Sequence, residues 1–141
     1  MTSPEGFEYF GVTADVGVRA WGPTTESAFR QVALGLFALI VELDLVEERE
    51  AREVRSQGDT PEALVVNWLN DCLYVHDIEG FLARRIEFTV FEARRLHALL
   101  WGEDLDPARH RVRTNVKAAT YHGLTVGQTD SAWEIRVVVD I

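Results

Sequence analysis

The last residues of the sequence read Trp133-Glu134-Ile135-Arg136-Val137-Val138-Val139-Asp140-Ile141, and we expect the fold to be organised around this run. Its β-branched residues favour a strand buried in the middle of a sheet. The strand ends in Asp140, and the carboxylate of Ile141 follows directly. Adjacent anionic groups repel each other unless water, a cation or hydrogen-bond donors compensate them. This end is therefore either a solvated chain end or a ligand-binding edge.

Length and composition are typical of one globular domain. The 141 residues are enough to bury a substantial core, and the apolar content of 47% with 26% charged residues excludes a disordered chain. The longest apolar run, Val32–Val41, is too short to span a bilayer, and the polar start Met1–Gly6 lacks signal-peptide character. We therefore expect a single domain over residues 1–141, in the cytoplasm and without a membrane partner.

Charge and cysteine content restrict the function further. The formal net charge is −9, whereas affinity for nucleic acid depends on Lys and Arg that neutralise phosphates. We therefore expect little direct nucleic-acid binding, and an acidic chain suits a cation site or a basic protein partner better. Cys72 is the only cysteine, which excludes a disulfide framework and a thiolate metal cluster.

The first part of the chain predicts two strands and a helix. Phe7–Phe10 and Val16–Trp21 are strand-like, and the polar residues Thr13-Ala14-Asp15 separate them. Either Thr24 or Thr25 can then cap a helix that carries a broad apolar face.

The middle of the chain predicts a charged strand and a second helix. Leu45–Arg55 is either a strand with one solvated face or an exposed helix end, and we favour the strand. Thr60 as cap and Pro61 at the first helical position then announce a helix that Gly80 ends. Cys72 lies on the apolar side of this helix, which favours an inert core residue.

From Phe81 onward the apolar period is close to two, which indicates strands. Arg94–Gly102 also fits a helical turn, but we interpret it as the second strand of a meander. Asn115–Val126 is predicted to be a strand, and Gly127–Asp130 turns the chain into the last strand. The pattern as a whole predicts the α+β class, with about two helices packed on one mostly antiparallel mixed sheet.

Carboxylates are the most promising chemical groups. Phosphate-binding glycine loops, nucleophile elbows and paired histidines at zinc spacing are missing from the sequence. Asp15 and Asp140 each lie at the end of a predicted strand. If those strands are neighbours, the two side chains and the Ile141 carboxylate supply the oxygen donors that Ca²⁺ and Mg²⁺ prefer.

Five short motifs occur in the order seen in the archease family, and together they span nearly the whole chain. They are Thr13–Gly17, Ala33–Phe37, Trp68–Tyr74, Val116–His122 and Val137–Ile141. Each is short and largely apolar, so their order carries the resemblance. The resemblance implies an archease-like fold and an accessory protein, not an enzyme.

What the resemblance implies about function is specific. Archeases assist the RtcB-type RNA-splicing ligase, which joins RNA ends during tRNA splicing and uses a guanylylated histidine and metal ions. The family promotes that guanylylation, which lets the ligase turn over repeatedly, and it broadens the choice of nucleoside triphosphate. An RtcB-type ligase is therefore the partner that the resemblance implies.

The resemblance also implies which residues matter. Asp15, Asp140 and Ile141 match the metal site of the family, for which Ca²⁺ or Mg²⁺ is expected, with Ca²⁺ slightly favoured. Lys117, in the Val-Lys-Ala motif, and His122 match positions implied in activation or partner contact.

One departure and two other function classes stay open. Family members usually carry Asp-His just before Thr-Ala-Asp, whereas this chain has Gly11-Val12, which weakens or alters a site that needs the histidine. A metal-dependent phosphohydrolase could use the same carboxylates with His122, although a nucleophile and a general base are not evident. A chaperone-like binding module would instead present an exposed apolar patch and would not depend on Asp15 or Asp140.

Overall fold

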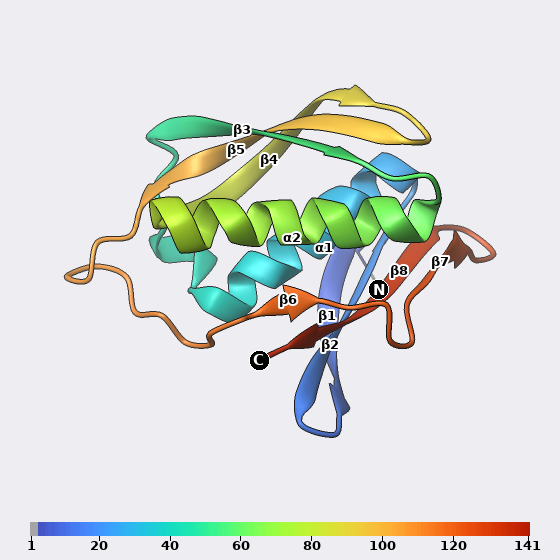
Figure 1. Ribbon diagram of the computed structural model, residues 1–141, viewed down its shortest axis with the longest axis horizontal. Helices are drawn as coiled ribbons and strands as arrows, with labels where there is room; N and C mark the ends of the chain where they lie inside the picture. Colours follow the sequence, from blue (N-terminus) through green and yellow to red (C-terminus); the bar gives the residue numbers. More distant parts are fainter. Residues whose placement is uncertain (1–2) are drawn as a thin grey trace.

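The computed structural model describes residues 3–141 as alternating strands and helices (Figure 1). The elements in chain order are β1 (Gly6–Val12), β2 (Asp15–Gly22), α1 (Thr25–Ile40), the 3₁₀ turn η1 (Leu43–Leu45), β3 (Glu50–Gln57), α2 (Pro61–Glu79), β4 (Phe81–Phe91), β5 (Arg95–Asp104), β6 (Ala118–Ala119), β7 (Thr125–Gln128) and β8 (Trp133–Asp140).

These strands form two antiparallel sheets with the helices between them. The larger sheet has the order β1-β2-β8-β6, with β7 also paired to β8, and the smaller sheet has the order β3-β5-β4. Helix α1 contacts β2 of one sheet and β4 of the other, and α2 contacts β3 and β6. Figure 1 shows the smaller sheet above the helices and the larger sheet below them.

The predicted class, α+β with two helices on antiparallel sheet, is confirmed. The strands divide between two sheets, however, where the sequence predicted one. The physical reason is that α1 is apolar around much of its circumference, with buried residues from Ser27 to Ile40. A single sheet covers only one face of such a helix, and the second sheet covers the rest.

Local capping chemistry explains where the helices begin and end. The Thr24 side chain accepts a hydrogen bond from the Ser27 backbone N–H, and the Ser27 hydroxyl accepts one from the Thr24 N–H, each at 3.0 Å. Thr60 caps α2, Pro61 takes its first position, and Gly80 ends it in the left-handed region at a φ of 67°. These signals were readable in the sequence, and Thr24 is the cap of α1.

The charged run expected as a strand from Leu45 to Arg55 is a strand in its second half. Leu43–Leu45 forms a 3₁₀ turn, and β3 begins only at Glu50 and runs to Gln57. Arg95–Asp104 is a strand, as predicted for the meander, and pairs with both β3 and β4.

The prediction of one strand over residues 115–126 is wrong. Only Ala118–Ala119 and then Thr125–Gln128 pair with β8. Thr120 follows β6, and its backbone N–H and its hydroxyl both donate to the Val138 carbonyl, at 3.1 and 2.9 Å. The chain then turns through Gly123 at a φ of 62°. The two short strands therefore use the same edge of β8 in succession.

The core between the sheets is centred on Trp68, which is fully buried. Its indole N–H donates to the Phe29 carbonyl at 3.0 Å, which joins α2 to α1. Cys72 is also fully buried, and burial raises the pKa of its thiol well above the ordinary value. Of the helices described within residues 3–141, none has the length and apolar character needed to cross a membrane.

Gly102 tests the packing of the smaller sheet. A Cβ at this position would lie 1.8 Å from the Leu82 carbonyl oxygen, so backbone must move to admit it. We expect Gly102→Ala to lower the free energy of unfolding by about 3 kcal/mol. Gly127→Ala is the matched control in the other sheet, since a Cβ there meets nothing within 4 Å, and we expect a change within about 0.5 kcal/mol. Urea denaturation measures both, and equal stabilities would contradict the close approach.

Candidate metal and partner site

The register of β2 against β8 determines where the predicted carboxylates lie. Val16 is opposite Val139, and the antiparallel pairing continues to Gly22 opposite Trp133. Extending this register by one residue places Asp15, the first residue of β2, opposite Asp140, the last residue of β8. Residues directly opposite each other project from the same face with Cβ atoms about 5 Å apart. The two predicted donors therefore each lie next to the last pair of this ladder, Val16 and Val139.

A tight turn presents Asp15. The pairing of β1 with β2 extends to Val12 opposite Asp15, so Thr13 and Ala14 alone connect the strands. Ala14 has a φ of 64°, the left-handed region that costs a residue with a Cβ about 1 kcal/mol. Figure 1 shows this hairpin as the projection that reaches beyond the body of the molecule.

The carboxylates at this edge have no protein partner in the part of the chain described, residues 3–141. Asp15 and Asp140 are half-buried, Ile141 is exposed, and neither aspartate side chain takes part in a hydrogen bond or ion pair there. Groups of three or more His, Cys, Asp or Glu placed to hold a metal are not found among these residues. The predicted donor set contains only two such side chains, with a main-chain carboxylate as the third donor.

Gly11-Val12, the departure from the family pattern, borders this edge. Val12 lies opposite Asp15 on the side away from β8, and Gly11 lies opposite Val16. A histidine at position 12 would project beside Asp15, whereas valine offers no donor atom. The donor groups predicted at this edge are therefore all carboxylate oxygens, and such donors fit a hard cation.

Lys117 is brought to the same edge by β6. Ala118 is opposite Asp140, and the Lys117 backbone N–H donates to the Asp140 carbonyl at 2.8 Å. The Lys117 side chain is exposed and forms no ion pair within residues 3–141. The structure therefore places the Lys117 backbone against Asp140, while Ala118 is the residue that shares the face of the Asp140 side chain.

His122 lies farther along the chain, in the exposed turn after β6. Its backbone N–H donates to the Thr120 hydroxyl at 3.3 Å. Within residues 3–141 the imidazole makes no polar contact with Asp15 or Asp140. The structure thus gathers Asp15, Asp140, Ile141 and Lys117, and leaves His122 on the neighbouring surface.

A sequence model described as the archease protein family matches residues 7–141, nearly the whole chain that forms this fold and this edge. The chain belongs to the archease family. Protein archease of Pyrococcus abyssi is 39% identical over 139 residues, which cover 96% of this chain and 98% of that protein. Protein archease of Danio rerio is 33% identical, over 96% of this chain and 85% of that protein.

Solved structures agree on the archease fold. The solution structure of Methanobacterium thermoautotrophicum protein 1598 is 31% identical and superposes with a TM-score of 0.80, over 96% of this chain and 99% of that one. The crystal structure of an archease from Thermotoga maritima, described as a possible chaperone, covers 100% of this chain and 98% of that one. At 19% identity and a TM-score of 0.58, it shows the likeness of fold alone.

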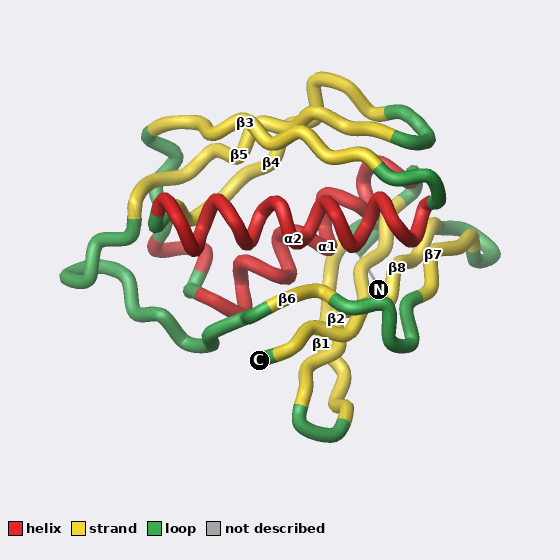
Figure 2. The backbone as a smooth tube through the Cα atoms, in the orientation of Figure 1, coloured by secondary structure: helices red, strands yellow, loops and turns green. Residues whose placement is uncertain are grey.

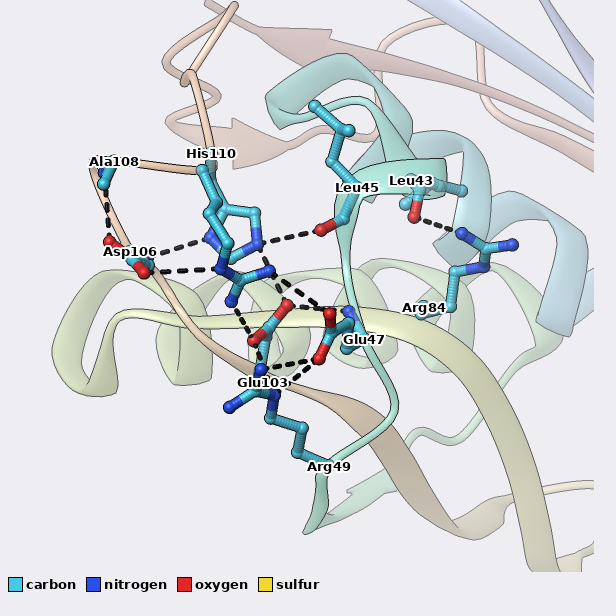
Figure 3. Close-up of polar contacts among 10 residues, drawn as sticks. Leu43, Leu45, Glu47, Arg49, Arg84, Glu103, Asp106, Ala108 and His110 are labelled. Atoms are coloured by element: carbon cyan, nitrogen blue, oxygen red, sulfur yellow. Dashed lines mark hydrogen bonds and ion pairs between the residues drawn. The ribbon is translucent and has the colours of Figure 1, made fainter.

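A buried ionic cluster in this archease was not predicted from the sequence. Glu103, near the end of β5, has a side chain only 5% exposed (Figure 3). It accepts hydrogen bonds from the Glu47 backbone N–H at 2.7 Å, from His110 at 3.0 Å and from Arg109. The only signal in the sequence was the isolated histidine His110 beside a predicted turn. Nothing in that pattern indicated that Glu103, 7 residues away, would be its partner.

The hydrogen bonds of His110 define its tautomer. Its Nδ1 accepts the Asp106 backbone N–H at 2.8 Å, so Nδ1 is unprotonated. The proton therefore lies on Nε2, which faces the Glu103 carboxylate at 3.0 Å and the Leu45 carbonyl at 3.1 Å. Figure 3 shows this imidazole between the segment that leaves β5 and the segment that enters β3. The cluster thus joins two irregular segments.

Stability in acid tests this cluster. Burial opposes ionisation of Glu103, but the hydrogen bonds from Arg109, the Glu47 N–H and His110 outweigh it and lower its pKa from 4.5 to about 2. A carboxyl group whose pKa is lower in the folded than in the unfolded protein stabilises the fold at pH values above its unfolded pKa. This stabilisation is lost as the pH falls through the folded pKa. We expect a contribution on the order of 3 kcal/mol that disappears between pH 4.5 and about 2.

Glu103→Gln removes this titration while keeping the shape of the side chain. The variant should be less stable than the parent at pH 7, and the difference should shrink as pH falls from 4.5 towards 2. Thermal unfolding across that range measures it. A difference that is independent of pH would contradict the role of the ionised carboxylate.

Proposed function

We propose that this archease-family protein activates an RtcB-type RNA-splicing ligase. It promotes guanylylation of the ligase, sustains repeated turnover and widens the range of nucleoside triphosphates that the ligase accepts. The observation that supports the proposal is the β2–β8 register in a chain that belongs to the archease family: its last pair is Val16 and Val139, and Asp15 and Asp140 are the next residues on each strand. The protein acts as an accessory factor, and the chemical step belongs to the ligase.

The proposed site holds a divalent cation, Ca²⁺ or Mg²⁺, with Asp15, Asp140 and the carboxylate of Ile141. These oxygens fit a hard cation, because their mutual repulsion is otherwise compensated only by water. When bound, the cation supplies positive charge and open coordination positions at this edge. Lys117, whose backbone N–H donates to the Asp140 carbonyl, adds a cationic side chain at the same end of β8, and His122 extends the contact surface.

The charge of the chain supports a basic partner. A ligase that grips RNA must present Lys and Arg, and a protein with a formal net charge of −9 is steered towards such a surface. The proposed contact is therefore between proteins, with little direct binding of RNA by this chain. We place the pair in the cytoplasm.

A chaperone-like module is the second candidate, and one observation favours it. Tyr74 and Ile78 lie one helical turn apart on α2 and are 63% and 66% exposed, which forms an apolar patch on a helix. The Thermotoga maritima archease is itself described as a possible chaperone. Suppression of aggregation of unrelated proteins that survives loss of Asp15 and Asp140 would favour this function. The phosphohydrolase alternative would instead show metal-dependent release of phosphate from model esters.

The direct test is multiple-turnover RNA ligation by the matching ligase with and without this protein. We expect the protein to raise the number of turnovers per ligase. Asp140→Ala, or a short extension after Ile141, should abolish the gain, because each removes a proposed carboxylate ligand. A wild-type protein that leaves turnover unchanged would end the proposal, and an active Asp140→Ala variant would end the site assignment.

Position 12 provides a gain-of-ligand test. Val12→His places an imidazole opposite Asp15, and nitrogen ligands favour Zn²⁺ far more than Ca²⁺. We expect the affinity for Zn²⁺ to rise about tenfold or more while Ca²⁺ binding changes little. Isothermal titration calorimetry measures both ions. Val12→Asn, with a side chain of oxygen and nitrogen but no imidazole, is the control, and unchanged Zn²⁺ affinity in Val12→His would contradict the site.

A further inference from the structure

The connection from β5 to β6, residues 105–117, carries Lys117 to the carboxylate edge without regular secondary structure of its own. Figure 2 shows it as the long loop that leaves the smaller sheet and returns beneath α2. Its first part is held by the cluster of Glu103 and His110. The second part has a separate anchor, Arg113.

Arg113 binds the C-terminal end of α1. Its backbone N–H donates to the Ile40 carbonyl at 2.7 Å, and its guanidinium donates to the carbonyls of Ala38 at 2.9 Å and Val41 at 3.2 Å. The last carbonyls of a helix have no partner within the helix, and a cation is favoured there by the helix dipole. The last turn of α1 contains no basic residue, so Arg113 supplies from a distant segment the charge that the helix itself lacks.

The anchor lies close to Lys117 along the chain. Val116 is buried at 2% exposure, and the next residue donates its backbone N–H to Asp140. Only residues 114–116 lie between the Arg113 anchor and Lys117, so the position of Arg113 restricts where the Lys117 amide can lie. The side chain of Lys117, in contrast, forms no ion pair within residues 3–141. Among these residues, Lys117 is therefore positioned through its backbone alone.

We propose that Arg113 is a positioning residue: by fixing the loop on the end of α1, it holds Lys117 beside Asp140. A role of Lys117 in ligase activation rests on the proposed function. The positioning of Lys117 by Arg113 is independent of that function. The two are therefore tested by separate measurements.

Positioning is measured without the ligase. Lys117 is the only lysine in the sequence, so labelling with ¹⁵N-lysine gives one backbone amide signal, that of the N–H bonded to Asp140. We expect Arg113→Met to accelerate hydrogen exchange of this amide about tenfold or more, because the loop opens locally more often. Arg113→Lys keeps the charge but not the fork of donors, and exchange should be intermediate.

Arg84→Met is the matched control. The Arg84 guanidinium also donates to a backbone carbonyl, that of Leu43 at the start of the 3₁₀ turn, at 2.5 Å, but Arg84 lies on β4 and not on the loop. Exchange at Lys117 should stay within about twofold of the parent. Unchanged exchange in a folded Arg113→Met protein overturns the proposal. If that variant does not fold, Arg113→Lys decides, and parental exchange there overturns it equally.

The functional arm is a double-mutant cycle in the ligation assay. If Arg113 acts through Lys117, Arg113→Met should raise the activator concentration for half-maximal stimulation, and adding it to Lys117→Met should cause no further change. A merely structural effect would instead add to that of Lys117→Met and would overturn the coupling. A wild-type protein without stimulation ends the proposed function, while the exchange measurement still decides the positioning.

Discussion

The pairing of β2 with β8 is the interaction on which the rest of the structure depends. It joins residues near the start of the chain to its last strand, so one ladder closes a loop of more than a hundred residues. Val18 and Ala20 on β2 and Ile135 and Val137 on β8 are fully buried beneath the helices. Because side chains alternate between faces, a slip of one residue would turn this apolar set to solvent. The same register ends at Val16 and Val139, next to Asp15 and Asp140, so core packing and the candidate site share one constraint.

Polar side-chain contacts hold the irregular segment that no strand pairing fixes. The long segment between β5 and β6 is held by a buried carboxylate, a histidine in one tautomer and an arginine on the end of α1. Each of these side chains hydrogen-bonds backbone or charged groups of the segments that it joins. The segment is therefore an ordered connector between the two sheets. It brings a lysine from the smaller sheet's side of the molecule to the edge of the larger sheet.

The candidate residues Asp15, Asp140 and Lys117 come from one part of the molecule. The half-buried aspartates and the exposed lysine lie where the hairpin of β1 and β2 meets the end of β8. The Gly11-Val12 pair adds no donor side chain there, so the donors proposed for a cation are all carboxylates. Exposed Tyr74 and Ile78 lie on α2, so an apolar contact and an ionic contact can be tested by separate substitutions.

The sequence by itself determined the local features. A cap at Thr24 or Thr25, the cap at Thr60, the helix end at Gly80 and the alternation in β4 and β5 depend on neighbours a few residues away, and these were predicted. The ordered motifs also gave the family and the candidates Asp15, Asp140 and Lys117. The division into two sheets, the double use of the β8 edge, the Glu103–His110 cluster and the clamp of Arg113 on α1 were decided only by the tertiary structure. Each depends on contacts between residues distant in sequence, and such contacts leave no period, cap or turn signal in the chain.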